Sequence, residues 1–461
     1  MRNHIKGILY ILIVLSVFSS DIFALDADIS SHLIISLNDA IQLALKNNSD
    51  LKDAEDSLSG SMFDLDIAKS EFSTRFNQSL STDYVFGTQT GRRFDLSFSK
   101  KLRTGTVVEV NTGTTNLDTS HLSEIRTRIR QPLLRGFGLL ATSAGIMDAE
   151  RRILKRKNLI GIAREQLILN VILNYYRIVR KKKIIDVHQK SLLRAKKLLE
   201  AGRAKLEAGM VSRMDLFRAE IRLSETGMAL ADSKDASEDS KDSLKILLGL
   251  PMDTRIEVDS KIDYKPVDAD LSKYVDLALK NRPEIREAEA EINDAKRRVK
   301  IARWNLLPSV DLSLNYSRYG TGNNFEDSID LNDERYGIGL ISSLTLDRAS
   351  EKASHQRALI DLRKRERDHR LIKENIIREV RHSIRNLSRN VENIEIQKRN
   401  VEQAEKILEL AMIRYRKGLS DNLSVIEAEE NLIKTKSNYI TAMTDYIVSR
   451  AGLKKVAGIL E

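Results

Sequence analysis

The residue types that could support catalysis or metal binding are present in this chain, but without the spacing that such chemistry needs. The 461 residues include no cysteine, which excludes disulfides and thiolate metal sites. Gly136 and Gly138 lack the third glycine and the βαβ context of a dinucleotide-binding loop. The histidines form no pair four residues apart and have no carboxylate at ligand spacing: they are His4, His32, His121, His188, His355, His369 and His382. The sequence therefore predicts no enzyme, no cofactor and no metal site.

Two glycines end long helical segments, and each is followed by residues that can begin a new helix. Gly209 and Gly418 come after a basic or polar last turn and precede a serine or aspartate suited to an N-cap. This pattern predicts two helix hairpins. Met210, Val211 and Leu419 place apolar side chains on these exposed turns, which is unusual unless a partner protein covers them.

Two carboxylates are singled out by their positions in the hairpins. Asp215 and Glu427 follow the two hairpin glycines by six and nine residues, near the start of each returning helix. Copies of Glu427 in a symmetric oligomer would form a carboxylate ring, which favours cations. The alternative is that Glu427 is solvated helix surface, as we expect for its neighbours Glu429 and Glu430.

The elements that carry these residues occur twice in the chain. Residues 37–80 align without a gap onto 271–314, at an offset of 234. Residues 195–250 align onto 404–459 at an offset of 209, keeping the hairpin glycines and an Ala-Glu pair in register. Repeats of this length indicate a duplicated helix–strand–helix unit.

The N-terminus predicts export from the cytoplasm. Residues 1–24 are expected to be a secretory signal peptide, because Arg2 and Lys6 precede an apolar run that ends at Phe18. That run is too short to span a bilayer, and no later stretch approaches the ~18 apolar residues of a membrane helix. The net charge of +10 is carried by interspersed charges. Such a pattern is typical of solvated helices and not of a nucleic-acid-binding stripe.

Long helices should form most of the chain, since its five prolines all lie at segment boundaries. We expect short helices over 37–71 and 271–305, and helix hairpins within 132–248 and 347–461 that turn at the two glycines. The long first helix of each hairpin, at 1.5 Å per residue, would extend about 105 Å.

Each long helix needs two shorter ones beside it to match its length. The summed lengths allow the return helix 210–248 to be continued by 271–305, and the return helix 419–458 by 37–71. Residues 249–270 would then lie with the termini around the middle, as an equatorial linker.

The segments between the helices, 72–131 and 309–346, alternate apolar and polar residues. Strands of about ten residues with one apolar face are typical of an outer-membrane β-barrel, and a half-buried soluble sheet is the alternative. A few strands cannot close a barrel, and an open edge is not tolerated in lipid, so the chain must oligomerise. Residues 93–116 have the pattern of an extra hairpin, which leaves four or six strands for each chain.

Two further motifs accompany the duplication: Gln131-Pro132-Leu133-Leu134-Arg135-Gly136-Phe137-Gly138 and Leu277-Ala278-Leu279-Lys280-Asn281-Arg282-Pro283-Glu284. Together with the two hairpins, they make the mature sequence resemble the TolC-type outer membrane efflux protein family. The resemblance implies an α+β membrane protein: a homotrimeric outer-membrane β-barrel, continued by a long periplasmic α-helical barrel and built from two helix–strand–helix repeats.

The resemblance also implies location, partners and function. Members of the family lie in the outer membrane of a Gram-negative-type envelope, with a large periplasmic portion. They serve as passive exit ducts of tripartite efflux pumps or type I secretion systems. Their partners are a periplasmic adaptor, which docks on the hairpin tips, and an ABC or proton-driven inner-membrane transporter.

The family narrows its periplasmic entrance with acidic side chains. By this resemblance Glu427 matches a constricting acid, and Ser424 stands where another acid is expected. Asp215 matches an acid that links the hairpins, and Tyr415 lies at a matching aromatic position. This implies that Asp215→Ala or Tyr415→Phe would raise the open probability of the channel.

Two other classes of protein remain as alternatives. A structural coiled-coil protein of the envelope would contain no barrel and would dissolve without detergent. A stand-alone diffusion porin would have no use for long periplasmic helices. The sequence indicates neither the exported substrate nor the class of inner-membrane transporter.

Overall fold

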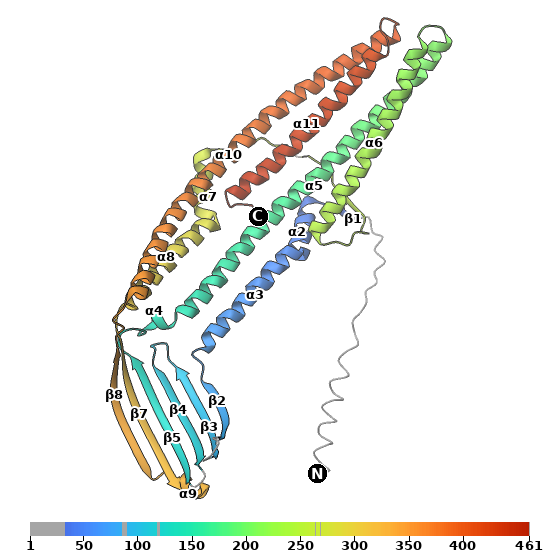
Figure 1. The fold of residues 1–461 in the computed structure, drawn as a ribbon. Helices are drawn as coiled ribbons and strands as arrows, with labels where there is room; N and C mark the ends of the chain where they lie inside the picture. Colours follow the sequence, from blue (N-terminus) through green and yellow to red (C-terminus); the bar gives the residue numbers. More distant parts are fainter. Residues whose placement is uncertain (1–32, 85–89, 118–119, 263, 268, 461) are drawn as a thin grey trace, which may run out of the picture.

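The computed structural model describes residues 33–84, 90–117, 120–262, 264–267 and 269–460. The predicted signal peptide lies outside these residues. The chain forms an elongated body of helices with one sheet at its end, and both hairpin turns lie at the opposite end (Figure 1). None of the described helices is both long and apolar enough to cross a membrane.

The described elements alternate between helices and strands in two rounds, as the repeats require. In chain order they are β1 (Leu33–Ile35), α2 (Leu37–Asn47), α3 (Ser49–Ser70), β2 (Arg75–Tyr84), β3 (Thr90–Lys101), β4 (Val107–Leu117), β5 (Ser120–Pro132), α4 (Leu139–Thr142), α5 (Ala144–Glu207), α6 (Arg213–Leu248), β6 (Ile256–Val258), α7 (Leu271–Asn281), α8 (Pro283–Trp304), β7 (Ser309–Gly322), α9 (Phe325–Ile329), β8 (Asp333–Ser343), α10 (Ala349–Arg416) and α11 (Leu423–Val456).

The large sheet has six antiparallel strands in the order β2-β3-β4-β5-β7-β8, with β2 and β8 as its edges. The β3–β4 pair occupies the segment 93–116, for which the sequence suggested an extra hairpin, and it lies within the sheet. This insertion also accounts for the fall in repeat offset from 234 to 209 along the chain. Of the four or six strands that the sequence allowed, the described residues therefore form six in this sheet.

The apolar side chains of this sheet lie on one of its faces, and most of the large ones are exposed. Cross-strand pairs such as Phe76 with Phe98, and Leu314 with Ile338, put the alternating apolar positions of all strands on the same side. The exposed large side chains of this face are Phe76, Leu80, Phe94, Phe98, Ile125, Leu314, Tyr316, Tyr336, Ile338 and Leu340. The opposite face carries polar residues such as Arg126, Ser313 and Asn315. Apart from the short helix α9 at one end, no described helix covers the apolar face, so something outside the chain must do so.

The last strand ends earlier than the sequence predicted. We expected strands to residue 346, but β8 pairs with β7 only as far as Ser343, opposite Ser309. Pro308 directly precedes Ser309, and proline has no N–H with which to extend the ladder.

The predicted short helices are each divided in two. Residues 37–71 form α2 and α3, separated at Asn48, whose side chain accepts a hydrogen bond from the Leu51 N–H at 3.1 Å. Residues 271–305 form α7 and α8, separated at Arg282, because Pro283 disfavours a helical conformation in the residue before it. The breaks let each short helix change direction where it meets the middle of the body.

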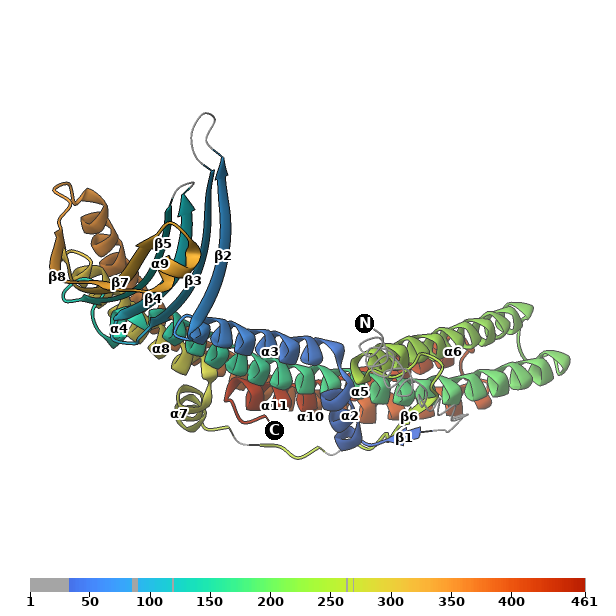
Figure 2. The ribbon, with the colours of Figure 1, turned by 90° about the horizontal axis from the view of Figure 1, so that it is seen from below.

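The predicted stacking of the helices was wrong. The structure packs α3 and α2 against α5, beside α6, while α8 and α7 pack against α10, beside α11 (Figures 1 and 2). Each long helix is thus flanked by helices of its own repeat. Length could not decide this, because the two short segments are copies of each other and have the same number of residues.

The predicted equatorial linker crosses the middle of the helical body. Its strand β6 pairs in parallel with β1 from the N-terminal end of the described chain (Figure 2). The buried Tyr175 of α5 donates a hydrogen bond to Asp259 O at 3.1 Å, and Tyr446 of α11 donates one to Lys265 O at 2.7 Å. A cluster of buried side chains from α2, α5 and α6 lies beneath the β1–β6 pair. The middle of the chain is therefore held by apolar packing.

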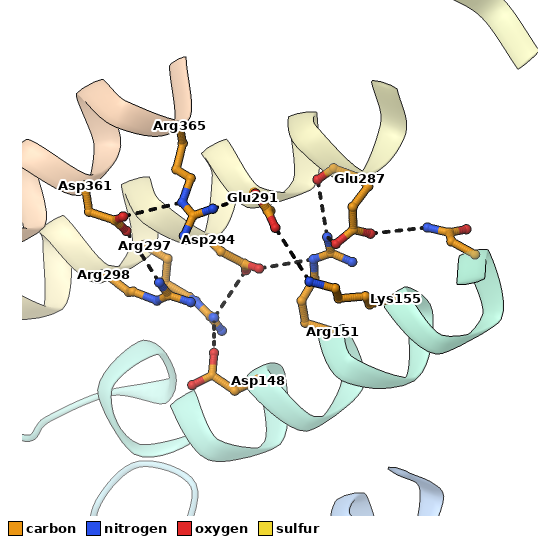
Figure 3. Close-up of polar contacts among 11 residues, drawn as sticks. Asp148, Arg151, Lys155, Glu287, Glu291, Asp294, Arg297, Arg298, Asp361 and Arg365 are labelled. Carbon is orange, nitrogen blue, oxygen red and sulfur yellow. Dashed lines mark hydrogen bonds and ion pairs between the residues drawn. The ribbon is translucent and has the colours of Figure 1, made fainter. Parts of the chain in front are cut away.

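Nearer the sheet, the two repeats are joined by ion pairs instead (Figure 3). Arg151 of α5 contacts Glu287 of α8 at 2.5 Å and Asp294 of α8 at 3.1 Å. Arg297 pairs with Asp148 of α5 and with Asp294 at 3.2 Å. The network continues to α10, where Arg365 bonds to Glu291 at 2.9 Å. We call these contacts the α5–α8 ionic joint.

Candidate functional site

The two hairpin turns expose apolar side chains at the end of the body farthest from the sheet. Gly209 and Gly418 adopt left-handed φ angles of 70° and 73°, which favour glycine and reverse the chain after α5 and α10. Met210 is 65% exposed and Leu419 is 66% exposed, while Val211 is partly covered. The tips thus present the apolar residues that the sequence indicated, uncovered in the single chain.

Asp215 is a buried residue that helps to start α6. Its carboxylate accepts hydrogen bonds from the Ser212 N–H at 3.1 Å and from the Ser212 hydroxyl at 2.8 Å. The hydroxyl in turn accepts from the Asp215 N–H, which completes a capping box. Asp215 therefore has a structural role in its own hairpin, apart from any contact with the other one.

Two contacts join the Asp215 region to the second hairpin. The side-chain amide of Asn422, which is 1% exposed, donates a hydrogen bond of 2.6 Å to the backbone carbonyl of Asp215. Arg218 lies 3.7 Å from the carboxylate of Asp215 and 3.5 Å from that of Asp421, so it bridges the two hairpins. The sequence indicated Asp421 only as a possible N-cap, and that was wrong, because α11 begins after Asn422. It did not single out Asn422 or Arg218, because a buried asparagine and an exposed ion pair have no spacing signature.

Tyr415 is buried between the hairpins, but its hydroxyl makes no link. The residue is 3% exposed, and its hydroxyl has no hydrogen-bond partner among the described residues. Lys205 of α5 places its ammonium 4.1 Å from the ring centroid and donates to the Tyr415 carbonyl. Burial raises the pKa of the Tyr415 hydroxyl, and the charge of Asp215 raises it further. The ring and backbone of Tyr415, and not its hydroxyl, connect the hairpins in this structure.

Glu427 and Ser424 lie apart from these links. Both are exposed on α11, and Glu427 has no ion pair with any described residue. They line a shallow groove of about 420 Å³ together with Ile407, Leu410 and Asn431. The carboxylate of Glu427 is therefore free to contact solvent, or Glu427 of another copy of the chain.

The strongest links between the hairpins involve glutamates that we expected to be solvated. Glu429 is 6% exposed, and Arg194 of α5 binds its two oxygens with contacts of 2.6 to 2.9 Å. Glu430 accepts a hydrogen bond of 2.7 Å from Arg222 of α6. For Glu429, the expectation of a solvated side chain was wrong.

Packing between the hairpins near these links is incomplete. A cavity of about 290 Å³ lies between α5, α10 and α11, bounded by Leu198, Leu408, Met412, Tyr415 and Val425. Protein interiors are ordinarily close-packed, and the seam between the hairpins is not. Separation of the hairpins here would therefore break polar links but little apolar contact. Among the residues that the structure describes, no cluster of histidine, aspartate or glutamate could hold a metal ion.

Comparison with known sequences finds a family and a curated relative to which this chain is similar. Residues 274–459 match the family model described as outer membrane efflux protein. The chain is also 28% identical over 270 residues to nodulation protein T of Rhizobium leguminosarum bv. trifolii. The match covers 57% of this chain and 56% of that protein, so the chain spans about half the length of the curated relative.

The fold is similar to those of solved outer-membrane channels. The Campylobacter jejuni CmeC outer membrane channel superposes with a TM-score of 0.71 at 18% identity, over 92% of this chain and 86% of that one. The Vibrio cholerae outer membrane protein VceC gives 0.70 at 18% identity, over 92% and 97%. CusC gives 0.70 at 17% identity, over 93% of both chains. These comparisons confirm the resemblance to the efflux family and the mixed helix and strand fold.

Proposed function

We propose that this protein is a passive exit duct in the outer membrane of a Gram-negative-type envelope, part of a tripartite efflux pump or a type I secretion system. It is a homotrimer, in which the sheets close a β-barrel and the helices form a tube through the periplasm. It is not an enzyme. A periplasmic adaptor and an ATP-driven or proton-driven inner-membrane transporter supply its cargo and its energy.

The observation that carries this proposal is the bare apolar face of the six-stranded sheet, whose edges β2 and β8 have no partner strand among the described residues. In lipid, an apolar face is stable, but unpaired strand edges are not. Joining β8 of one chain to β2 of the next satisfies both edges and puts the apolar face outward. Three chains then give an eighteen-stranded barrel, wider than one built from four strands per chain.

The length of the helices supports the periplasmic tube. The 68 residues of α10 extend about 100 Å at 1.5 Å per residue. The six-stranded sheet lies at one end of this body and the hairpin turns at the other (Figure 1). A membrane-embedded sheet therefore places the exposed tips Met210 and Leu419 deep in the periplasm, where an adaptor would cover them.

The links between the hairpins hold the periplasmic entrance closed. Arg194 with Glu429, Arg222 with Glu430, and Asn422 with Asp215 all connect the first hairpin to the second. Outward movement of α10 and α11 would break all three contacts and widen the entrance. The three copies of Glu427, with Ser424 beside them, form a carboxylate ring at the constriction, which favours cations.

Single-channel recording in planar bilayers tests the proposal. The purified trimer should insert and remain mostly closed, with rare openings that select for cations. Neutralisation by Glu427→Gln should lower that selectivity, while Glu405→Gln, which removes an exposed carboxylate paired to Lys436 on the same hairpin, should not. Failure of the wild-type protein to form any pore would contradict the proposed duct.

Asn422→Ala should raise the open probability of the channel about tenfold. The substitution removes a buried hydrogen bond between the hairpins, a cost of about 1.4 kcal/mol to the closed state. Tyr415→Phe is the matched control. It keeps the ring and deletes a hydroxyl without a described partner, so recordings should show little change. A larger effect from Tyr415→Phe than from Asn422→Ala would contradict this account of the gate.

A further inference from the structure

The short helix α9 lies against the apolar face of the sheet, at the end farthest from the long helices (Figure 1). Ser328 of α9 is fully buried, and its hydroxyl lies 2.9 Å from that of Ser123 in β5. Two glycines of β7 admit this approach. A Cβ on Gly320 would lie 2.4 Å from the Ser328 carbonyl oxygen, and one on Gly322 would lie 2.4 Å from Asp327 Cβ. The position of α9 therefore depends on glycine at these two positions of β7.

A cavity of about 410 Å³ lies between α9 and strands β3, β4 and β5. Leu80, Phe94 and Phe325 form its apolar wall, and each of these side chains is at least 40% exposed. The cavity opens on the same face of the sheet as the uncovered apolar residues. A ligand in it would thus contact the medium that surrounds the barrel, not the channel interior.

The other side of the cavity carries hydrogen-bond donors and positive charge. Arg92, Asn116 and His121 line it, and Arg92 has no ion pair with any described residue. The buried Nδ1 atom of His121 has no hydrogen-bond partner in the described part of the chain. No carboxylate is among the described residues that line the cavity, so it favours an anion. Arg93 is neutralised by Asp95 at 2.9 Å.

The polar groups lie at the outer end of the sheet. Arg92 is two residues from the start of β3 at Thr90, and His121 is one residue from the start of β5 at Ser120. Phe98 lies six residues further along β3, about 20 Å along the strand at 3.3 Å per residue, and so deeper in the apolar band. Arg92 and His121 are thus at the level of lipid headgroups, with the apolar wall at the level of the first acyl carbons.

We propose that this cavity binds a phosphorylated lipid of the outer leaflet, with Arg92 and His121 contacting the phosphate and an acyl chain lying on Leu80, Phe94 and Phe325. The inference rests on the proposed function, because it requires this face of the sheet to meet lipid. Guanidinium and imidazole donors suit phosphate oxygens, and the adjoining apolar wall distinguishes a lipid phosphate from the free ion.

Native mass spectrometry of the delipidated trimer, titrated with lipid A, tests the assignment. The wild-type protein should bind the phosphorylated lipid at least about tenfold more tightly than the Arg92→Gln/His121→Gln variant, since each charge-assisted contact stabilises the complex. The control is Arg126→Gln, which removes an arginine on the polar face that pairs with Glu124, and it should bind like wild type. Equal affinities of wild type and double variant would overturn the proposal.

Two competing ligands identify what is recognised. Lipid A stripped of its phosphates should bind as weakly to wild type as intact lipid A binds to the double variant. Displacement of lipid A by inorganic phosphate in excess would overturn the lipid assignment in favour of a free-phosphate site. Channel recording on the same samples separates the two proposals: a conducting trimer without phosphate-dependent lipid binding contradicts only the lipid site, and a protein that forms no pore contradicts the duct.

Discussion

Replacement of Arg194 by alanine should raise the open probability of the channel about thirtyfold, a larger effect than any other single change in the hairpins. Arg194 holds both oxygens of Glu429, whose side chain is 8% exposed, across the seam between α5 and α11. Loss of the guanidinium leaves Glu429 buried without a counter-charge in the closed state. After allowance for the partial exposure of Arg194, we expect a cost of about 2 kcal/mol, or thirtyfold in the closed-to-open equilibrium.

Arg203→Ala is the matched control for this prediction. Arg203 also lies on α5, but its partner Glu220 belongs to the same hairpin, at 3.5 Å, and both side chains are largely exposed. Its removal should leave the open probability within about twofold of wild type, as is usual for surface ion pairs. Exchange of the charges in Arg194→Glu/Glu429→Arg should restore part of the closure. Equal opening in the Arg194→Ala and Arg203→Ala variants would contradict a gate held by the seam.

Arg151→Ala should lower the stability of the trimer by about 3 kcal/mol without opening the channel. Arg151 is the centre of the α5–α8 ionic joint, with a side chain that is 15% exposed and carboxylate partners at 2.5 and 3.1 Å (Figure 3). Its removal leaves Glu287 and Asp294, both about one-fifth exposed, with less positive charge to balance them. Urea unfolding in detergent, followed by circular dichroism, measures the loss.

The neighbouring residue provides the control for the ionic joint. Arg152 pairs with Asp64 at 3.7 Å, and both side chains are more than half exposed. Arg152→Ala should therefore change the unfolding free energy by less than about 0.5 kcal/mol. A loss in Arg151→Ala no greater than this would show that the joint does not stabilise the fold. A rise in open probability would contradict the division between a fixed joint near the sheet and a moving seam at the tips.

Two kinds of contact along the helices lead us to expect that the proposed opening is confined to the tips. At the middle, the two hairpins are joined by buried apolar residues, Ile168 and Ile172 of α5 with Ala451 of α11. At the tips, the seam between the hairpins has a cavity of about 290 Å³ and is held by polar links. Apolar packing is lost over its whole area when helices part, whereas a few polar links can be replaced by water. Separation of the two hairpins should therefore cost the least free energy near Gly209 and Gly418.

Sequence patterns identified the strands and hairpins because their signals are local. Alternation along residues 93–116 indicated the extra hairpin that the structure places within the sheet as β3 and β4. The positive φ angles of Gly209 and Gly418 occur where the helical pattern stops. In both cases the residues that produce the pattern are those that form the element.

Features that depend on contacts between distant segments could not be predicted in this way. The stacking of α3 on α5 is independent of length, because 37–71 and 271–305 are repeat copies. The burial of Glu429 depends on Arg194, which is 235 residues away. An isolated helix offers no reason to distinguish Glu429 from Glu427, yet one is paired and buried and the other is exposed.

Electron microscopy of the protein extracted by detergent from the outer-membrane fraction tests the central claim most directly. We expect threefold particles in which a barrel of eighteen strands, six from each chain, lies within the micelle. A helical tube whose long helices extend about 100 Å should project from it and end in the hairpin tips. Rod-shaped particles that need no detergent and have no micelle would contradict the membrane duct and favour a structural coiled-coil protein of the envelope.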